Sequence, residues 1–346
     1  MEKLKIGIIG AGRMGITHMS ILGPNPNIKI TAISEPSKLI GSLFEKYFSG
    51  LTVYSDYNEM IQKEELDGLL LCTPPNLHKS IGLQAIEKGI NLFVEKPFTT
   101  SYKDAIELAE RAECKRLVGQ VGYVNRFNDM FLKAKELLKN GIVGEVIRFK
   151  TEMFSSTICK PDDGEGWRGK IESGGGCLFE MGSHAIDLVN YLIGIPDKIS
   201  GSLLNKVYSK NVEDIVSSSF YYNNGIVGTL FVNWCDPTYR KPSNKIEIFG
   251  SEGKMLVSQH ELKIFLKSLR SDYKLSKGWN TIYITDIFNN VPFYVRGNEF
   301  TSQLFHFVDN IIDRSKTNIC TFADGANTQR VIEEIRADAK INMGSN

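Results

Sequence analysis

The chain opens with a short apolar run that ends at three closely spaced glycines, Gly10, Gly12 and Gly15. Gly10 would permit a tight turn, Gly12 would let the backbone approach a ligand, and Gly15 would let a helix pack against the preceding strand. Arg13 and Met14 lie between the last two glycines, at the start of that helix. Because the free N–H groups at a helix amino terminus attract anions, this spacing predicts an α/β fold that binds a dinucleotide pyrophosphate.

The segment from Lys5 to about Tyr123 alternates short apolar runs with amphipathic stretches. Strands that are apolar throughout and separated by helices are typical of a parallel sheet covered on both faces. The expected strands are Ile6–Ile9, Ile28–Ser34, Gly68–Thr73, Ile90–Val94 and Leu117–Val121. The expected helices are Arg13–Leu22, Leu39–Phe48, Tyr57–Gln62, Leu77–Lys88 and Tyr102–Cys114.

Beyond the expected helix Asp129–Lys139 the pattern changes to longer strands of alternating polarity, which favour an antiparallel sheet with one covered face. Asn223-Asn224-Gly225 and Ser251-Glu252-Gly253 are typical of hairpin turns. The expected strands are Val146–Met153, Ile199–Asn205, Ile215–Tyr222, Ile226–Trp234, Lys245–Phe249, Met255–Ser258 and one around Thr281–Thr285. We therefore expect two domains: an α/β Rossmann domain (a doubly wound parallel sheet) over 1–122, and an α+β domain with a large, mostly antiparallel open sheet over 123–346, whose last helix could pack back on the first domain.

Charge and cysteine content argue against several classes of protein. Lys and Arg number 41 and Asp and Glu 40, giving a net charge of +1, so we expect no nucleic-acid or membrane-surface partner. The six cysteines lie far apart without a CxxC pair, which favours reduced thiols over disulfides or a metal cluster. No apolar run approaches the ~20 residues of a membrane span, and the first strand begins too early to leave room for a signal peptide. We expect a cytoplasmic protein without a bound metal.

Glu35 stands at the end of the second expected strand, about twenty residues after the last glycine of the pattern. A carboxylate at this place would bind the adenosine ribose hydroxyls and repel a 2′-phosphate, so NAD is favoured over NADP. Ser34, Ser37 and Lys38 lie nearby and leave NADP possible. The alternative interpretation is a surface glutamate before Pro36.

The segment from Thr73 to His78 follows another expected strand. Ligands of such sheets bind outside the carboxyl ends of the strands, so Thr73, Pro74 and Asn76 should border the cofactor, and Asn76 could also cap the next helix. His78 could contact the cofactor or the substrate. More often, such a histidine is a structural residue in the first turn of a helix.

Glu95-Lys96-Pro97 ends the strand Ile90–Val94 on the same edge of the sheet. An ammonium group there could orient a substrate hydroxyl or carbonyl and stabilise negative charge developing on its oxygen. Glu95 would border the cofactor beside Lys96. The alternative is an exposed lysine at a strand end.

The stretch Gly174–Leu188 begins with three glycines, and its apolar spacing predicts a helix over Leu178–Leu192. Glu180, His184 and Asp187 would then share one face. A carboxylate beside an imidazole suits proton transfer and the binding of hydroxyl groups. A surface ion pair is the alternative, and a metal site lacks an evident third ligand.

Four motifs, in their order and separation, make the chain resemble the Gfo/Idh/MocA family of NAD(P)-dependent dehydrogenases over essentially its whole length. They are the glycine pattern, Thr73–His78, Glu95-Lys96-Pro97 and Gly174–Leu188. The resemblance implies that Lys96 lies between the nicotinamide and the substrate and that His184 is the general base. It further implies that Glu180 replaces a family aspartate that helps to hold the substrate. Asp187 matches the family pattern and is interpreted as structural. Glu180 is one methylene longer than the family aspartate and so departs from the family pattern. This departure leaves the substrate and the catalytic competence open.

The resemblance also implies an oxidoreductase for sugars, polyols or nucleotide sugars that forms dimers or tetramers through its open sheet. Five residues could line a substrate pocket: Arg126, Trp167, Arg168, Tyr239 and Arg240. The segment 161–176 could be a mobile loop near the site or plain surface. Two alternatives stay open: a non-catalytic cofactor-binding sensor of the same fold, which Glu180 keeps possible, and more distantly a metal-dependent hydrolase.

Overall fold

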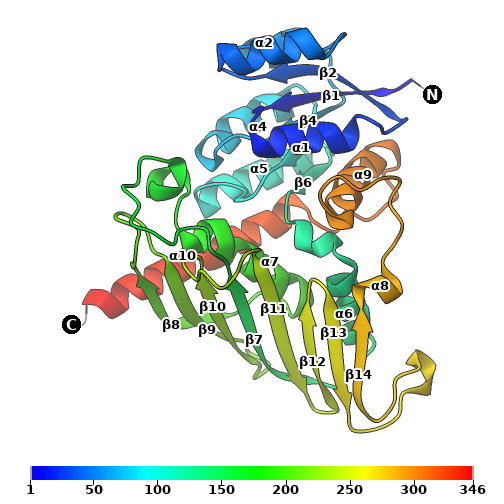
Figure 1. Cartoon of the computed structure of the whole chain (residues 1–346), viewed down its shortest axis with the longest axis vertical. Helices are drawn as coiled ribbons and strands as arrows, with labels where there is room; N and C mark the ends of the chain where they lie inside the picture. The colour runs from blue at the N-terminus through cyan, green and yellow to red at the C-terminus, as the bar shows by residue number, and fades with distance from the viewer. Residues whose placement is uncertain (1, 345–346) are drawn as a thin grey trace. The chain divides into compact units, whose positions relative to one another are not determined.

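The computed structural model describes residues 2–344 and divides into two compact units (Figure 1). The first unit comprises Met1–Val124 and Asn290–Ala326, and the second comprises Asn125–Asn289 and Asn327–Asn346. The first stretch of chain therefore ends within two residues of the expected boundary at residue 122. The segment 290–326, expected in the second domain, instead returns to the first unit.

The first unit is built on a six-stranded parallel sheet with the strand order β3-β2-β1-β4-β5-β6. The strands are β1 Leu4–Ile9, β2 Ile28–Ser34, β3 Thr52–Tyr54, β4 Gly68–Leu71, β5 Asn91–Val94 and β6 Gly119–Val121. All five expected strands are present, and their parallel arrangement confirms the doubly wound fold. The sequence pattern missed β3, because this edge strand has only three residues and none of them is fully buried.

Helices on this sheet begin at recognisable caps. Ser37, Asp56 and Ser101 each accept a hydrogen bond from a main-chain N–H group in the first turn of α2, α3 and α5. The helices of the unit are α1 Arg13–Leu22, α2 Lys38–Tyr47, α3 Tyr57–Lys63, α4 His78–Glu87, α5 Tyr102–Cys114 and α9 Asn298–Ile312, with a short 3₁₀ turn at Pro75–Leu77.

Helix α9 explains why the segment 290–326 belongs to the first unit. It lies beside α1 (Figure 1), and Leu304, Phe307 and Val308 are fully buried in the same core as Ile6 and Phe93. The chain then pairs with the sheet edge, where the Val121 N–H donates to the Cys320 carbonyl at 3.0 Å. An amphipathic helix has the same sequence pattern whichever sheet it covers, so the sequence could not assign α9 to its core.

The second unit contains an eight-stranded sheet in the order β14-β13-β12-β11-β7-β10-β9-β8, in which only the pair β7–β10 is parallel. The strands are β7 Val146–Phe154, β8 Lys198–Asn205, β9 Ile215–Tyr221, β10 Val227–Asn233, β11 Ser243–Gly250, β12 Gly253–Ser258, β13 Glu261–Leu266 and β14 Gly278–Tyr283. Both expected hairpin turns are present. The sequence pattern missed β13, and β14 begins three residues before the expected strand at Thr281.

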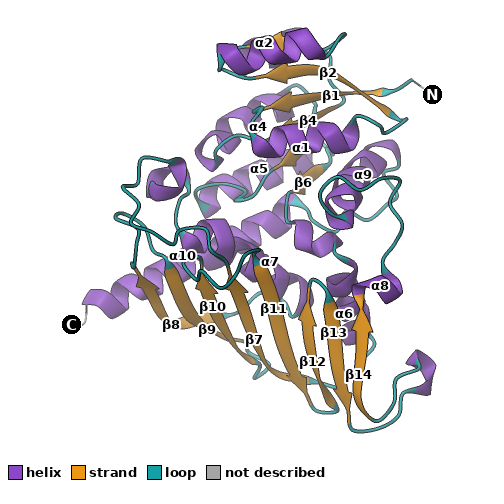
Figure 2. Cartoon of the chain, viewed as in Figure 1, coloured by secondary structure: helices purple, strands orange, loops and turns teal. Residues whose placement is uncertain are grey.

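Helices cover one face of this sheet, and the other face is open (Figure 2). The helices are α6 Asp129–Lys139, α7 Ser183–Leu192, α8 Ile284–Ile287 and α10 Phe322–Gly344. Burial alternates along β10, where Leu230 and Val232 are buried and Val227 and Phe231 are exposed, as expected for an open sheet. Among the described residues, no helix has both the length and the hydropathy that crossing a membrane requires.

Candidate functional site

The glycine loop of the first unit leaves one open position. Gly10 has φ +94°, and a Cβ atom there would lie 2.8 Å from the Cys72 carbonyl oxygen. A Cβ atom on Gly15 would lie 1.9 Å from the Gly10 carbonyl oxygen, whereas one on Gly12 would meet no atom within 4 Å. Gly10 and Gly15 thus serve the turn and the packing of α1 against it. Gly12 faces open space, which fits the close approach of a pyrophosphate.

Helix α1 presents its amino terminus to this open space. Its N-cap residue is Gly12, which has no side chain to bind the N–H groups of the first turn, and Arg13 is exposed. These N–H groups and the positive end of the helix dipole are therefore available to an anion. The arrangement matches what the glycine pattern predicts for a dinucleotide.

Glu35 lies at the edge of the same loop. Its carboxylate accepts a hydrogen bond from the Ala11 N–H at 2.9 Å and another from the Ser37 N–H at 3.0 Å. The side chain is half-buried, and Ser37 caps helix α2. The carboxylate is thus held beside the glycine loop at the carboxyl end of β2, where the ribose of a dinucleotide lies in such folds.

The sequence predicts that His78 contacts the cofactor, but in the structure its side chain makes other contacts. His78 is fully buried, and its ring nitrogens lie 3.0 Å from the Phe98 carbonyl oxygen and 2.9 Å from the Thr73 carbonyl oxygen. Burial lowers the pKa of His78, and the hydrogen bonds to the two carbonyls oppose this effect. His78 joins the loop after β4 to the segment after Lys96. Asn76 is exposed and lies within the 3₁₀ turn, so it does not cap α4.

Two other residues of this loop keep the predicted position at the edge of the sheet. Pro74 is exposed, and Thr73 is half-buried directly after β4. The Thr73 hydroxyl is buried, and no hydrogen-bond partner for it occurs among residues 2–344. A polar atom in that state is suited to a ligand.

Glu95 is also buried, which contradicts its expected contact with the cofactor. Only 8% of the residue is exposed, and one carboxylate oxygen lies 2.5 Å from Nε2 of His18 in α1. The other oxygen accepts the Lys96 main-chain N–H at 3.1 Å. Glu95 therefore fixes the backbone beneath Lys96, which is half-buried and precedes a cis peptide bond to Pro97.

Sequence reasoning did not identify His18. A signal existed, because His18 follows Gly15 by three residues and precedes Leu22 by four, which places it on the buried face of α1. A fully buried polar side chain on a helix needs a hydrogen-bond partner. For His18 this partner is Glu95, which the sequence predicts at the cofactor site.

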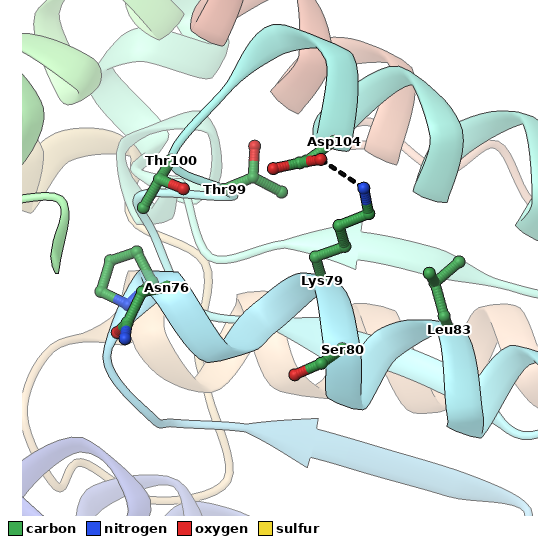
Figure 3. Close-up of a pocket in the computed structure, with 8 residues that line it drawn as sticks. Asn76, Lys79, Ser80, Leu83, Thr99, Thr100 and Asp104 are labelled. Atoms are coloured by element: carbon green, nitrogen blue, oxygen red, sulfur yellow. Dashed lines mark hydrogen bonds and ion pairs between the residues drawn. The ribbon is translucent and has the colours of Figure 1, made fainter. Parts of the chain in front are cut away.

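A shallow pocket of about 300 Å³ lies between α4 and the segment after Lys96 (Figure 3). Its lysine, Lys79, points at Asp104 and contacts it at 2.5 Å, and hydrogen bonds to Asp104 and Glu107 raise the pKa of Lys79. The pocket is lined by Pro75, Asn76, Lys79, Ser80, Leu83, Thr99, Thr100 and Asp104. This lining includes neither the glycine loop nor Lys96, but Asn76 belongs to the segment that is predicted to border the cofactor.

In the second unit, three glycines allow the loop before the site helix to approach its neighbours. Gly174 and Gly176 have φ of +81° and +103°, and a Cβ atom on Gly176 would lie 2.4 Å from the Glu213 carboxylate. That carboxylate accepts the Leu178 N–H at 3.0 Å. Burial raises the pKa of Glu213. The glycines thus let Glu213 hold the start of the helical segment that carries Glu180 and His184.

This helical segment does not have the single face expected for Glu180, His184 and Asp187. Leu178–Gly182 is wound as a π-helical turn, and α7 begins only at Ser183. The wider turn shifts Glu180 relative to α7. Glu180 and His184 are partly exposed, whereas Asp187 is buried.

Arg126, which is predicted to line the substrate pocket, binds Asp187 in the structure. Only 3% of Arg126 is exposed, and its Nε and Nη2 donate to the two carboxylate oxygens of Asp187 at 2.9 Å and 2.8 Å. The guanidinium also stacks over the Tyr191 ring at 5.0 Å. A buried two-pronged ion pair of this kind fixes α7 from within the core.

Trp167, Arg168 and Glu180 do lie together. Arg168 donates to a Glu180 carboxylate oxygen at 3.2 Å, and its guanidinium lies 4.6 Å over the Trp167 ring. Trp167 and Arg168 belong to the segment 161–176. The Asp162 N–H of this segment donates a hydrogen bond to the Tyr208 carbonyl at 3.2 Å. This side-chain cluster is a candidate surface for substrate hydroxyls.

Comparison with known proteins identifies the family. Residues 4–123 match the model of the oxidoreductase family with an NAD-binding Rossmann fold. Residues 131–256 match the model of the GFO/IDH/MocA C-terminal domain. The chain belongs to the Gfo/Idh/MocA family. This result confirms the resemblance seen in the sequence, and it makes the first unit an NAD-binding Rossmann domain of an oxidoreductase.

Individual Gfo/Idh/MocA proteins are distant relatives of the chain. An uncharacterized oxidoreductase of Schizosaccharomyces pombe is 30% identical over 206 residues, which span 59% of this chain and 55% of the relative. The scyllo-inositol 2-dehydrogenase (NAD(+)) of Bacillus subtilis is 24% identical over 81% of this chain and 82% of that protein. The solved complex of levoglucosan dehydrogenase with NADH and levoglucosan has a TM-score of 0.85 at 21% identity over 98% of each chain, which shows a shared fold.

The remaining expected substrate residues of this Gfo/Idh/MocA protein are not part of the cluster around Glu180. Tyr239 packs on the Phe154 ring at 5.1 Å, and Arg240 is exposed. Within residues 2–344, neither side chain makes a hydrogen bond, ion pair or ring contact with Trp167 or Arg168. Within the described part of the chain, no group of three or more His, Cys, Asp or Glu side chains could hold a metal ion.

Proposed function

We propose that the chain is an NAD-dependent dehydrogenase that oxidises a secondary hydroxyl of a sugar, polyol or nucleotide sugar, or reduces the matching ketone. The observation that carries this proposal is the support of Lys96 at the carboxyl end of β5. The Glu95 carboxylate binds the Lys96 main-chain N–H, and His18 of the glycine-loop helix binds Glu95. The catalytic lysine and the NAD site thus share one rigid framework.

Bound NAD would supply the hydride acceptor at C4 of its nicotinamide ring. The Lys96 ammonium would donate a hydrogen bond to the substrate oxygen and stabilise negative charge on it as the carbon–hydrogen bond breaks. A ring nitrogen of His184 would accept the hydroxyl proton. In the reverse direction His184 would return this proton to the alkoxide oxygen.

Glu180 would hold further hydroxyl groups of the substrate. Its side chain is 16% exposed and is already oriented by Arg168. The family aspartate at this position is one methylene shorter, and the contact with Arg168 gives the longer carboxylate a fixed orientation. A carboxylate beside a guanidinium suits vicinal hydroxyls, as found in inositols and sugars.

We also propose that NAD is preferred over NADP and that the protein forms dimers or tetramers through its open sheet. Glu35 supports the cofactor preference, because a fixed carboxylate beside the ribose repels a 2′-phosphate. The exposed face of the sheet supports the assembly, since large aromatic side chains stand on it. They are Phe231, Phe249, Phe265 and Trp279, with exposed fractions of 37% to 59%.

The test is a panel of inositols, anhydrosugars and nucleotide sugars, with NADH formation as the readout. With the substrate that reacts, Lys96→Ala should reduce kcat by at least about 1,000-fold and leave the Kd for NADH nearly unchanged. Lys79→Ala is the control, because Lys79 is also partly exposed but is paired with Asp104 and Glu107 (Figure 3). Full activity of Lys96→Ala would remove the assigned role of the lysine.

A non-catalytic sensor of the same fold is the second candidate, and the replacement of the family aspartate by Glu180 favours it. A sensor would bind NADH and a sugar without changing the NADH absorbance. Glu180→Asp separates the two candidates. If the protein is an enzyme whose substrate differs from that of its relatives, Glu180→Asp should change the order of substrate preference. If the protein is a sensor, Glu180→Asp alone should not produce turnover.

A further inference from the structure

Arg296, which precedes α9 in the sequence, contacts the first turn of α1. Its Nη1 lies 3.3 Å from the sulfur of Met14, the residue before Gly15 in the glycine pattern. The guanidinium lies 4.8 Å over the Phe300 ring, one turn into α9. Because α9 is packed in the core of the first unit, this cation has a defined place beside the glycine loop.

Positive charge gathers around this turn without a matching carboxylate. Among residues 2–344, neither Arg13 nor Arg296 has a carboxylate oxygen within the 4.0 Å of an ion pair. Burial and then the charge of Arg13 lower the pKa of Arg296, while the charges of Glu95 and Glu299 oppose this effect. Glu95 is committed to His18 and the Lys96 N–H. The two guanidinium groups repel each other, and the helix amino terminus adds to the positive potential.

We propose that Arg296 binds the diphosphate of the dinucleotide, together with Arg13 and the amino terminus of α1. The inference rests on the cofactor binding assigned to the glycine loop and adds a residue from a segment that lies outside the family motif. A diphosphate over Gly12 would meet open space, the N–H groups of the first turn and two guanidinium groups. A guanidinium–phosphate contact is strong because both groups are charged and the donors form a fork.

The experiment measures the Kd of NADH, ADP-ribose and adenosine for the whole protein by titration calorimetry. Arg296→Met keeps the length and the contact with Phe300 and removes the charge. It should raise the Kd of NADH and ADP-ribose about tenfold or more, and leave adenosine binding unchanged. The dependence of the NADH Kd on salt should also become weaker. Arg296→Lys should lie between the wild type and Arg296→Met, because it keeps the charge and loses the fork.

Arg314→Met is the control. Its guanidinium also belongs to the first unit but binds Asn91 at 2.8 Å, so the variant should match the wild type with every ligand. If the wild type binds NADH and Arg296→Met binds it equally well with the same salt dependence, the inference is overturned and cofactor binding stands. An equal loss for adenosine would also overturn it, since the defect would not involve phosphate. A wild type that binds neither NADH nor ADP-ribose would overturn both proposals.

Discussion

His18 Nε2 lies 2.5 Å from Glu95 Oε1, and this contact joins the helix after the glycine loop to the strand end that carries Lys96. His18 is fully buried and stands edge-on to Phe93 with ring centres 5.3 Å apart. Its Nδ1 has no partner among the described residues, and its Nε2 donates to the Glu95 carboxylate. The positions of the cofactor loop and of Lys96 are thereby coupled.

His18→Ala should destabilise the protein by about 3–5 kcal/mol, because it leaves the buried carboxylate of Glu95 without its partner. Urea unfolding followed by circular dichroism measures the loss. His260→Ala is the control on an exposed turn and should change the free energy of unfolding by less than about 0.5 kcal/mol. Equal stability of the two variants would show that the His18–Glu95 contact contributes nothing.

Two alanine substitutions separate the packing role of Gly15 from the ligand-binding role of Gly12. Gly15→Ala places a Cβ atom 1.9 Å from the Gly10 carbonyl oxygen and should cost about 2–3 kcal/mol of stability. Gly12→Ala meets no atom within 4 Å and should leave thermal unfolding nearly unchanged, yet raise the Kd of NADH at least about tenfold. Unaltered NADH binding by Gly12→Ala would mean that no pyrophosphate occupies this space.

Glu35→Ser should shift the cofactor preference. Removal of the carboxylate deletes the acceptor for ribose hydroxyls and the repulsion of a 2′-phosphate, so the ratio of the NADPH Kd to the NADH Kd should fall about 100-fold. Titration with both cofactors measures this ratio. Glu64→Ser serves as the control, because this carboxylate binds Tyr54 on the edge strand β3. An unchanged ratio would place Glu35 outside the cofactor site.

Arg126→Met should lower stability and not substrate affinity. It leaves the buried Asp187 carboxylate without its cationic partner, at a cost of about 3–5 kcal/mol. The double variant Arg126→Met/Asp187→Leu should regain most of this loss, since both charges are gone. The exposed Arg148→Met is the control for urea unfolding. A higher KM at wild-type stability would instead restore the predicted contact of Arg126 with the substrate.

Asp214 should make stability depend on pH. Its carboxylate accepts the N–H groups of residues 207–209 and the Trp234 indole N–H at 2.6 Å. Burial alone would raise the pKa of Asp214, but these hydrogen bonds and that of the Ser209 hydroxyl lower it below its ordinary 3.8. The stabilisation is therefore present above pH 3.8 and is lost as the pH falls through the folded-state pKa.

Asp214→Asn should consequently cost about 3 kcal/mol at neutral pH, and the difference from the wild type should shrink below about pH 4. Urea midpoints across this range measure the difference, and the exposed Asp163→Asn provides the baseline. A difference that stays constant with pH would contradict a lowered pKa.

The elements of the first unit could be predicted where local pattern decides them. The glycine loop, the strands that follow it and Lys96 depend on residues close together in the sequence. Two features of the fold do not follow from local pattern: β3 is too short to show one, and α9 covers a sheet whose strands lie within residues 4–121.

The prediction of the site differs from the structure where polar side chains have partners elsewhere in the fold. His78, Glu95 and Arg126 look like ligand-binding residues by type and position, yet each is buried against a partner that its local sequence does not reveal. The π-helical turn at Leu178–Gly182 was also beyond prediction, because the apolar spacing that defines an α-helix tolerates one extra residue in a turn.

The return of residues 290–326 to the first unit sets the order in which the protein can mature during synthesis. The ribosome makes the amino-terminal sheet first, but the apolar face that Leu304, Phe307 and Val308 cover stays bare until the whole eight-stranded sheet has been translated. The core of the nascent NAD-binding unit therefore stays partly exposed until α9 has been synthesised. A premature stop after residue 289 would spare every strand and still leave the first-made unit unfinished.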